Sequence, residues 1–138
     1  MLRSCRDRRR ALTGEQRAAR QLVRLIVDRY NARDVEGLVA LYHDDAAYWS
    51  PLGDWQHGVG PIRAHLDELH RTLPDEQMSI EALVTDGVTA VVEFKSSGTS
   101  PAGKTYSIEF TEVIEIEDAK IKRVMVYLDP DEVQAITG

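Results

Sequence analysis

Hydrophobic positions in the first third of the chain recur at helical spacing and predict two helices joined by a very short turn. The first helix starts after Thr13, a plausible N-cap, and its apolar positions are Leu22, Leu25, Ile26 and Tyr30. Asp34 is placed to cap the second helix, whose apolar positions are Val35, Leu38, Val39 and Tyr42. Both segments are amphipathic, so each has one face to bury.

The rest of the chain predicts a third helix followed by long strands. After a short strand over residues 46–50 and an irregular loop, residues 60–73 have helical spacing, with Pro61 in the first turn and Pro74 after the end. Four strands follow, over residues 77–86, 88–98, 104–117 and 120–128. Short turns at "DG", "SPAG" and "EDAK" make them an antiparallel meander. This order predicts an α+β fold in which a curved antiparallel or mixed sheet wraps around three N-terminal helices.

The strand over residues 88–98 has one apolar and one polar face. Its apolar positions are Val88, Ala90, Val92 and Phe94. By this pattern alone, Val92 and Phe94 face the core, and Glu93 and Lys95 face water. If the polar face instead meets an internal cavity, Glu93 and Lys95 place a carboxylate beside an amine where they can take part in chemistry.

Glu112 is an anomaly in the strand over residues 104–117. The other residues on its face are Tyr106, Ile108, Phe110 and Ile114. A carboxylate on an apolar face must be paired, protonated or close to solvent, because desolvation disfavours its charged form. The alternative is a β-bulge around "EVIEI" that turns Glu112 outward.

Length and composition indicate a single domain and argue against some classes of partner. The 138 residues are 43% hydrophobic and 29% charged. No apolar run approaches the roughly 20 residues needed to cross a bilayer. The net charge of −6 argues against nucleic-acid binding, because phosphate contacts need a basic surface. We therefore expect neither a membrane nor a nucleic acid as partner.

The start of the chain predicts a leader outside the fold. Residues 1–13 are basic but lack the apolar core of a secretory signal, so we expect a mobile leader, a single domain over residues 14–138 and a cytoplasmic location. Cys5, the single cysteine, lies in this leader, which excludes an internal disulfide and a thiolate metal cluster. His65 and His70 are five positions apart, which does not stack two imidazoles on one helix face, so we expect no metal.

The loop before the third helix holds two further candidates. Trp55 and His57 could cover the mouth of a pocket, although a tryptophan near a loop also fits simple packing. The string "HGVGPI" lacks the third glycine of a dinucleotide fingerprint and the lysine and hydroxyl of a phosphate-binding loop. A helix-entry turn is the better interpretation of these glycines.

Several strings in order, "ARDVEGLVALYHDDAAYWSPLG", "HGVGPIRAHL", "SPAGKTYSIEF" and "KIKRVMVYLDPDE", carry a family resemblance. Over about residues 15 to 134 the chain resembles the nuclear-transport-factor-2-like superfamily, which includes ketosteroid isomerase, limonene-1,2-epoxide hydrolase and the SnoaL-like polyketide cyclases. The resemblance implies a cone-shaped, cystatin-like α+β barrel in which the concave face of the sheet and the helices enclose a pocket. That fold hosts enzymes and non-enzymes alike.

The resemblance favours an inward register for Glu93 and Lys95. Counted back from "SPAG", they match the positions at which the epoxide hydrolase carries an inward Arg and Asp. Val92 and Phe94 would then lie on the outer face of the sheet, where the family often packs a second subunit, so a homodimer is expected. A solvated pair of Glu93 and Lys95 is the alternative, because binary patterning is a real signal.

The known catalytic sets of the superfamily are incomplete in this chain. Tyr48 matches a tyrosine that helps hold the hydrolytic water in the epoxide hydrolase, but Ser50 replaces the neighbouring Asn and Val126 replaces an Asp. Relative to ketosteroid isomerase, Ser50 replaces the base Asp and Ile26 the oxyanion-hole Tyr. If one hairpin is a residue shorter, Glu112 falls where that enzyme has a protonated, hydrogen-bond-donating Asp. This match places Glu112 inside.

The predicted pocket has apolar walls and a few polar groups, which suits a hydrophobic small molecule with one or two oxygens, such as a polyketide or terpenoid. The catalytic candidates are Glu93, Lys95, Glu112 and Tyr48, and the substrate-binding candidates are Ser50, Trp55, His57, Tyr106, Ile108, Phe110, Val126 and Leu128. We expect a cofactor-independent isomerase, cyclase or dehydratase, in which a glutamate abstracts a proton while a lysine, a tyrosine or a neutral glutamate donates to the developing oxyanion. The alternatives are Schiff-base chemistry, an epoxide hydrolase with a rearranged catalytic set, and a non-catalytic binding or dimerisation module.

Overall fold

The structure is a computed structural model that describes residues 12–137. Its elements are, in chain order, α1 (Gly14–Asn31), α2 (Val35–Val39), β1 (Tyr42–Trp49), β2 (Gln56–His57), α3 (Val59–Thr72), β3 (Gln77–Thr85), β4 (Thr89–Thr99), β5 (Thr105–Glu117), β6 (Lys120–Tyr127) and α4 (Pro130–Thr137). The predicted mobile leader, including Cys5, lies outside the described residues except for its last two positions. No helix within residues 12–137 combines the length and apolar character needed to cross a membrane.

Helix α1 begins at the predicted cap. The Thr13 hydroxyl accepts a hydrogen bond from the Gln16 backbone N–H at 3.1 Å, and the Gln16 side chain accepts one from the Thr13 N–H at 2.9 Å. This reciprocal pair satisfies two backbone donors that a helix start leaves unpaired. The apolar stripe of the helix faces the sheet, and its buried residues are Ala19, Leu22, Val23, Ile26, Val27 and Tyr30.

Helix α2 is shorter than predicted, and β1 is longer. Asp34 caps α2 as expected, accepting from the Gly37 N–H at 2.9 Å, but the helix ends at Val39 and Tyr42 already belongs to β1. Tyr42 pairs with Ile121 of β6, so a tertiary strand contact overrides the helical spacing. The segment predicted as an irregular loop contains the short strand β2, which pairs with the end of β1.

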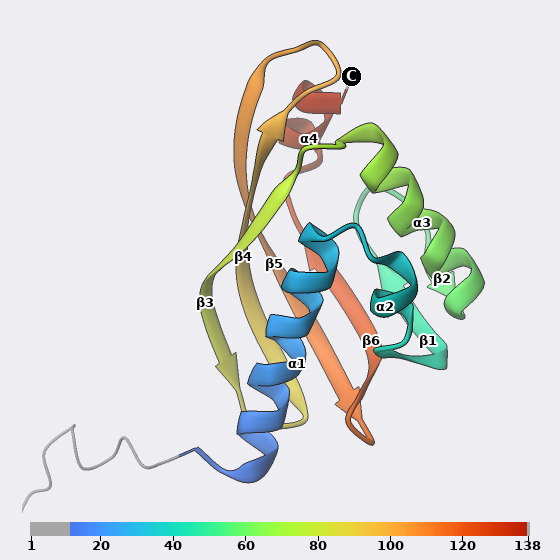
Figure 1. Cartoon of the computed structure of the whole chain (residues 1–138), viewed down its shortest axis with the longest axis vertical. Helices are drawn as coiled ribbons and strands as arrows, with labels where there is room; N and C mark the ends of the chain where they lie inside the picture. Colours follow the sequence, from blue (N-terminus) through green and yellow to red (C-terminus); the bar gives the residue numbers. More distant parts are fainter. Residues whose placement is uncertain (1–11, 138) are drawn as a thin grey trace, which may run out of the picture.

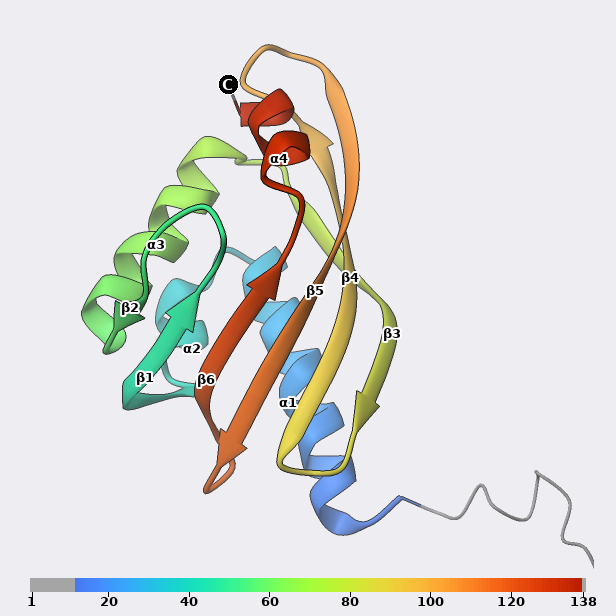
Figure 2. The same ribbon diagram turned by 180° about the vertical axis from the view of Figure 1, so that it is seen from behind.

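The six strands form one sheet in the order β2-β1-β6-β5-β4-β3. Neighbouring strands are antiparallel except for β1 and β6, which are parallel. The four predicted C-terminal strands are confirmed to within one residue at each end. The sheet is curved and unclosed, with α1, α2 and α3 on one face (Figure 1), and the opposite view shows the strands in front of α1 and α2 (Figure 2). The expected α+β class, with a curved mixed sheet around three helices, is confirmed.

The register of β4 corrects the prediction taken from the resemblance. Val92 and Phe94 have no exposed surface and face the helices, whereas Glu93 is half-buried and Lys95 exposed on the outer face. Burying a large apolar side chain stabilises the fold by roughly 1.5–3 kcal/mol, whereas an unpaired charge inside is costly. Because successive side chains of a strand point to opposite faces, Glu93 and Lys95 do not reach the interior. The alternation of apolar and polar residues therefore predicted the orientation of β4 correctly.

The inward placement of Glu112 is confirmed. It pairs with Val92 of β4 on one side and with Val126 of β6 on the other, and both valines are buried. The bulge considered around "EVIEI" exists, but the register shifts between Glu115 and Ile116, which lies beyond Glu112. The phase of Glu112 in its strand is therefore unchanged.

A C-terminal helix that the sequence patterns did not predict follows β6. Asp129 starts it, since its carboxylate accepts from the Asp131 N–H at 2.9 Å and its carbonyl accepts from the Val133 N–H at 3.2 Å. This helix, α4, lies at the same end of the molecule as the β4–β5 hairpin (Figure 1). Val133 from α4 closes part of the space between the sheet and α3.

Candidate functional site

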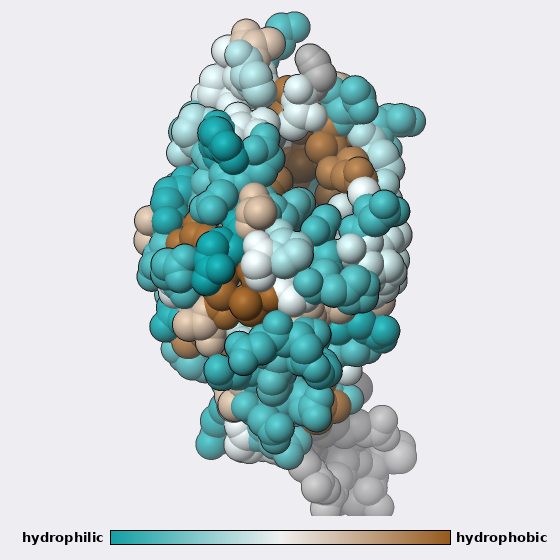
Figure 3. Space-filling model, turned by 90° about the vertical axis from the view of Figure 1, so that its right-hand side faces the viewer, coloured by the Kyte–Doolittle hydropathy of each residue, from teal (hydrophilic) through white to brown (hydrophobic). Residues whose placement is uncertain are grey.

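An internal cavity of about 120 Å³ lies between the concave face of the sheet and the helices. Its walls are mainly apolar, with Ile26 from α1, Leu66 and Leu69 from α3, and Ile108 and Val126 from the sheet. The polar side chains that line it are Tyr30, Tyr42, Tyr48, Ser50, His65, Glu76 and Glu112, and its lining within residues 12–137 contains no lysine or arginine. Figure 3 shows an apolar hollow in the upper part of the face on which α3 lies.

The structure brings most of the predicted pocket residues to this cavity. Those that line it are Tyr48, Ser50, Ile108, Phe110, Glu112, Val126 and Leu128. Those that do not are Glu93, Lys95, Trp55, His57 and Tyr106. The apolar walls and Glu112 were therefore placed correctly, whereas the charged pair and the loop aromatics were not.

Glu112 is the one carboxyl group that projects from the middle of the sheet into this cavity. It is partly buried, and its side chain lines the cavity. Burial raises its pKa from 4.5 to about 7, and no charge or hydrogen bond from the described residues offsets this effect. Near neutral pH the group is thus close to half protonated, which suits both proton uptake and proton release.

Two tyrosine hydroxyls share the cavity with Glu112. Tyr42 and Tyr48 come from β1, and both are buried residues whose side chains line the cavity. Burial raises the pKa of each hydroxyl, and the nearby charge of Glu112 raises it further. Both hydroxyls are therefore protonated at neutral pH and are available as hydrogen-bond donors. The sequence analysis placed Tyr48 here but assigned Tyr42 to a helix.

Glu76 forms a second buried carboxyl site at another part of the lining. Only 6% of its surface is exposed, and its carboxylate accepts hydrogen bonds from the Tyr30 hydroxyl and from Ser96 Oγ. Arg33 holds the same loop, since its guanidinium donates to the Glu76 carbonyl at 2.6 Å. Sequence reasoning missed Glu76, because no periodic pattern marks a buried residue in the short loop between α3 and β3.

His65 is a third residue that the sequence analysis did not place in the pocket. It lies on α3 between the buried residues Ile62 and Leu66, and its ring centroid is 4.9 Å from that of Tyr48. Burial lowers the pKa of His65, so the ring is neutral at neutral pH. Its helical spacing from Ile62 and Leu69 is a signal that could have identified it, whereas a search for metal-binding histidine pairs could not.

Trp55 and His57 lie on the outer side of the sheet, which corrects their predicted position at the pocket mouth. Their rings stack on each other with centroids 6.2 Å apart, and Trp55 also lies 6.3 Å from Trp49. The packing interpretation of Trp55 was the right one. Tyr106 is also outside the cavity lining: its hydroxyl is buried close to Gly98 and has no hydrogen-bond partner among residues 12–137.

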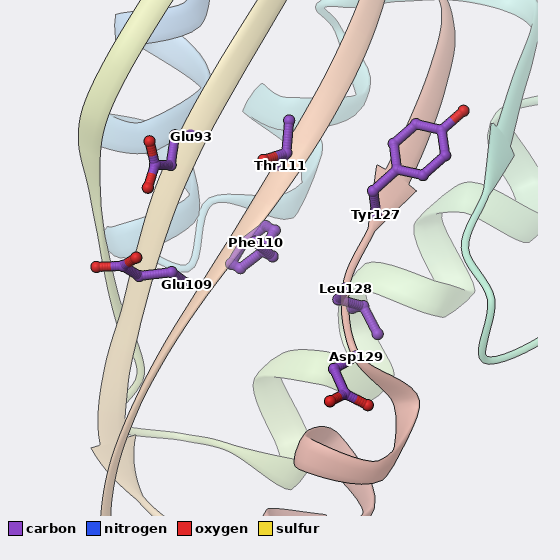
Figure 4. A pocket seen from close by; sticks show the side chains of 7 residues that line it. All are labelled: Glu93, Glu109, Phe110, Thr111, Tyr127, Leu128 and Asp129. Carbon is purple, nitrogen blue, oxygen red and sulfur yellow. The ribbon is translucent and has the colours of Figure 1, made fainter.

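Glu93 lines a shallow, open hollow on the outer face. The other residues of this hollow are Glu109, Phe110, Thr111, Tyr127, Leu128 and Asp129. In Figure 4 the carboxylates of Glu93 and Glu109 project away from Asp129 and do not converge with it. Among residues 12–137, no group of three or more His, Cys, Asp or Glu side chains is arranged to hold a metal ion.

Comparison with known structures shows the same fold. A candidate SnoaL-like polyketide cyclase from a Jannaschia species aligns with a TM-score of 0.84 at 12% identity, covering 92% of this chain and 96% of that one. An NTF2-like protein of unknown function from Burkholderia pseudomallei aligns with a TM-score of 0.80 at 19% identity, covering 86% and 96%. TerC, crystallised with polyporic acid, aligns with a TM-score of 0.79 at 20% identity, covering 86% and 97%. Such identities establish the fold and not the activity.

Sequence comparison assigns the family. A search of curated protein sequences finds no match. The family model of the SnoaL-like domain matches residues 23–124, which run from α1 to β6. The chain therefore belongs to the SnoaL-like domain family of the NTF2-like superfamily.

Proposed function

We propose that the chain is a cofactor-independent acid/base enzyme of the isomerase, cyclase or dehydratase type, acting on a hydrophobic, oxygenated small molecule in the internal cavity. The observation that carries this proposal is Glu112, a carboxyl group with a pKa of about 7 that faces apolar walls and two tyrosine hydroxyls. Structural neighbours named as candidate polyketide cyclases, and TerC with polyporic acid, support a ligand of this kind. A polyketide or terpenoid skeleton matches the apolar walls.

The chemistry needs only groups that line the cavity. The ionised Glu112 takes a proton from a carbon next to a substrate carbonyl, and the electron pair of the broken C–H bond moves to the carbonyl oxygen. The hydroxyls of Tyr42 and Tyr48 donate hydrogen bonds to that oxygen as its charge develops. The protonated Glu112 then returns the proton to another carbon, giving an isomer, or to a departing hydroxyl, giving water. Lys95 is exposed on the outer face, and no lysine among residues 12–137 lines this cavity to form a Schiff base.

Exchange of α-protons tests the proposal without knowledge of the natural substrate. The apolar bicyclic ketone 2-tetralone is incubated with the protein in D₂O, and NMR follows the replacement of its α-protons by deuterium. We expect the wild-type chain to accelerate this exchange and the Glu112→Gln variant to lose the acceleration by about 100-fold or more. Glu109→Gln is the matched control, since Glu109 lies on the same strand but is exposed on the outer face.

Three outcomes would count against the assignment. If the wild type exchanges the α-protons of 2-tetralone no faster than buffer does, the cavity has no catalytic role in this reaction. Equal loss in Glu112→Gln and Glu109→Gln would show that a general effect of charge, and not the buried carboxyl, was responsible. Binding of 2-tetralone without exchange would favour the non-catalytic binding module instead.

We also propose that two copies of the chain associate through the outer face of the sheet. The earlier reason, burial of Val92 and Phe94 by a partner, no longer holds because both residues lie in the core. A different feature supports the proposal: one row of directly paired apolar residues crosses the outer face from β3 to β1. The row consists of Val84, Val91, Val113, Met125 and Trp49. Val84 is 69% exposed and Val91 42% exposed, so the row meets solvent in the single chain.

A further inference from the structure

A second chamber, of about 160 Å³, adjoins the main cavity. The two spaces share the lining residues Tyr48, Ser50, Leu52 and His65, so they are neighbours across a common boundary. The remaining lining of this second chamber is polar or lacks a side chain, and it consists of Gly53, Asp54 and Gln56. An apolar cavity thus lies beside a side chamber of different chemistry, and this chamber plays no part in the proton transfer proposed above.

His65 lines both spaces, and its ring nitrogens are available for hydrogen bonds. Its ring packs against that of Tyr48 at an angle of 50°. Neither of its ring nitrogens forms a hydrogen bond with any residue of the part of the chain that the structure describes. Because burial keeps the imidazole neutral, one nitrogen donates and the other accepts. Such a ring can pair with a hydroxyl or a carbonyl oxygen.

The other walls of the side chamber are held in place by local hydrogen bonds. Ser50 Oγ accepts from the Leu52 N–H at 3.3 Å, and the Ser50 carbonyl accepts from the Gly53 N–H at 3.3 Å. The Ser50 hydroxyl proton remains free to be donated, since no acceptor for it is found among residues 12–137. Gln56 is fixed by its place opposite Tyr48 in the β1–β2 ladder. The turn at Ser50 and the β1–β2 ladder therefore fix part of the lining of the chamber.

We propose that this side chamber is a second substrate subsite, in which His65 and Ser50 bind an uncharged hydroxyl or carbonyl oxygen at the end of the ligand remote from Glu112. The inference rests on the proposed function to the extent that the main cavity holds the apolar body of the same molecule. A carboxylate at that end is disfavoured, because Asp54 lines the chamber and no lysine or arginine among residues 12–137 does. The substrate is then a molecule with oxygens at both ends of an apolar skeleton. His65 is a specificity-determining residue and takes no part in the proton transfer.

A matched pair of ligands tests the subsite. 2-Naphthol and 2,6-dihydroxynaphthalene have the same skeleton, and only the second carries an oxygen at each end. By calorimetry we expect the wild type to bind the diol roughly tenfold more tightly, which is the size of effect that one or two well-formed neutral hydrogen bonds produce. In His65→Phe the ring against Tyr48 is retained, so we expect 2-naphthol to bind as before and the preference for the diol to disappear.

The controls separate this inference from the proposed function. Glu112→Gln should alter the affinity for both naphthols alike and keep the preference for the diol. Equal affinity of the wild type for the two ligands, or a preference that survives in both His65→Phe and Ser50→Ala, would overturn the subsite while leaving the exchange of 2-tetralone intact. If the wild type binds neither naphthol, the cavity is not a site for small molecules of this kind. This result would contradict both the subsite and the proposed function.

A crystal structure with 2,6-dihydroxynaphthalene gives an independent readout. We expect one hydroxyl within hydrogen-bonding distance of an imidazole nitrogen of His65 and the other in the main cavity. A diol bound with both oxygens away from His65 would contradict the inference. Thermal unfolding of His65→Phe and Ser50→Ala confirms that both variants are folded before affinities are compared.

Discussion

Val92 and Glu112 lie directly opposite each other across the β4–β5 ladder, on the face of the sheet that is turned to the helices. Val92 is completely buried, and Val126, which flanks Glu112 on the other side, is 3% exposed. A carboxyl group between two buried aliphatic side chains loses hydration when it ionises, and the protonated form is favoured. The strand register thus explains why the pKa of Glu112 is raised to about 7.

The first prediction is the titration of Glu112 itself. In a protein labelled with ¹³C at glutamate side chains, we expect one carboxyl resonance to titrate with a midpoint near pH 7. The resonance is assigned by its absence from the spectrum of Glu112→Gln. A midpoint for this resonance near 4.5, the ordinary value, would mean that water hydrates the carboxylate and that the cavity is open to solvent.

The same group predicts how stability depends on pH. Between pH 4.5 and about 7 the folded chain holds a proton on Glu112 that the unfolded chain has released, so this contribution to the free energy of unfolding falls as pH rises. The full loss above pH 7 is about 3 kcal/mol, which corresponds to the shift of the pKa from 4.5 to about 7. Urea unfolding at a series of pH values measures it.

Glu112→Gln is the control for this pH dependence. The amide has nearly the same shape and does not ionise, so we expect its variant to gain stability relative to the wild type as pH rises from 5 to 8. A difference between the two proteins that is constant over this range would show that Glu112 does not change protonation on folding.

The third prediction tests the orientation of β4. Phe94→Ala removes a side chain with no exposed surface, and we expect it to lower the free energy of unfolding by about 3–5 kcal/mol. Its neighbour Glu93 faces outward, so Glu93→Ala should change the value by about 0.5 kcal/mol or less. Chemical denaturation of the two variants compares them directly, and the reverse order would restore the inward register for Glu93.

The elements of this fold could be predicted from the sequence because each has a strong local signal. The strands β3 to β6 have a period of two and short turn motifs, and α1 has a cap and a stripe of period 3.6. The orientation of β4 was also present in the alternation of Val92 and Phe94 with Glu93. It was mispredicted only when a distant resemblance was allowed to override that alternation. The free energy gained by burying Phe94 determines the orientation of the strand, whereas a positional match to remote relatives is only weak evidence for it.

The site could be predicted only where its residues interrupt a regular pattern. Glu112 is conspicuous because it is a carboxylate on an apolar strand face. Tyr42 does not interrupt any pattern, because its place in the cavity depends on where α2 ends and β1 begins. Glu76 lies in a loop, and it is buried because Tyr30 and Ser96, far apart in the chain, both donate to it. Contacts of this kind arise from the tertiary fold, and no local pattern encodes them.

The fourth prediction concerns the two donors beside Glu112. Tyr42→Phe and Tyr48→Phe each remove one hydroxyl and keep the ring, so the cavity walls stay in place. If both hydroxyls stabilise a developing oxyanion, each variant should slow the exchange of 2-tetralone by a factor of about 100, through kcat and not KM. The rate of deuterium incorporation at several ketone concentrations separates the two parameters.

A rise in KM alone would contradict this role for the tyrosines, since it would mean that they bind substrate and transition state equally. Tyr30→Phe is the comparison variant, because the Tyr30 hydroxyl already donates to Glu76. We expect this variant to lower stability, since Glu76 loses one of its two donors, and to leave the exchange rate of the folded protein within a few-fold of the wild type.

The last prediction concerns the association of two chains. The outer apolar row, from Val84 through Val91, Val113 and Met125 to Trp49, crosses five of the strands without a polar interruption. A two-fold axis at its centre would place the row of one copy against that of another, which is the self-complementary contact of most homodimers. Val91 lies within this row and is exposed, so Val91→Glu should abolish association without harming the fold.

Light scattering after gel filtration measures the mass of each variant, and we expect twice the chain mass for the wild type and the chain mass for Val91→Glu. Val88→Glu is the matched control, because Val88 is 52% exposed but lies in the β3–β4 turn outside the row, and it should remain dimeric. A monomeric wild type would mean that the sheet face stays in water, while dissociation by both variants would indicate that added negative charge, and not loss of the apolar row, separates the chains. If Val88→Glu alone dissociates, the contact lies at the hairpin end of the sheet instead.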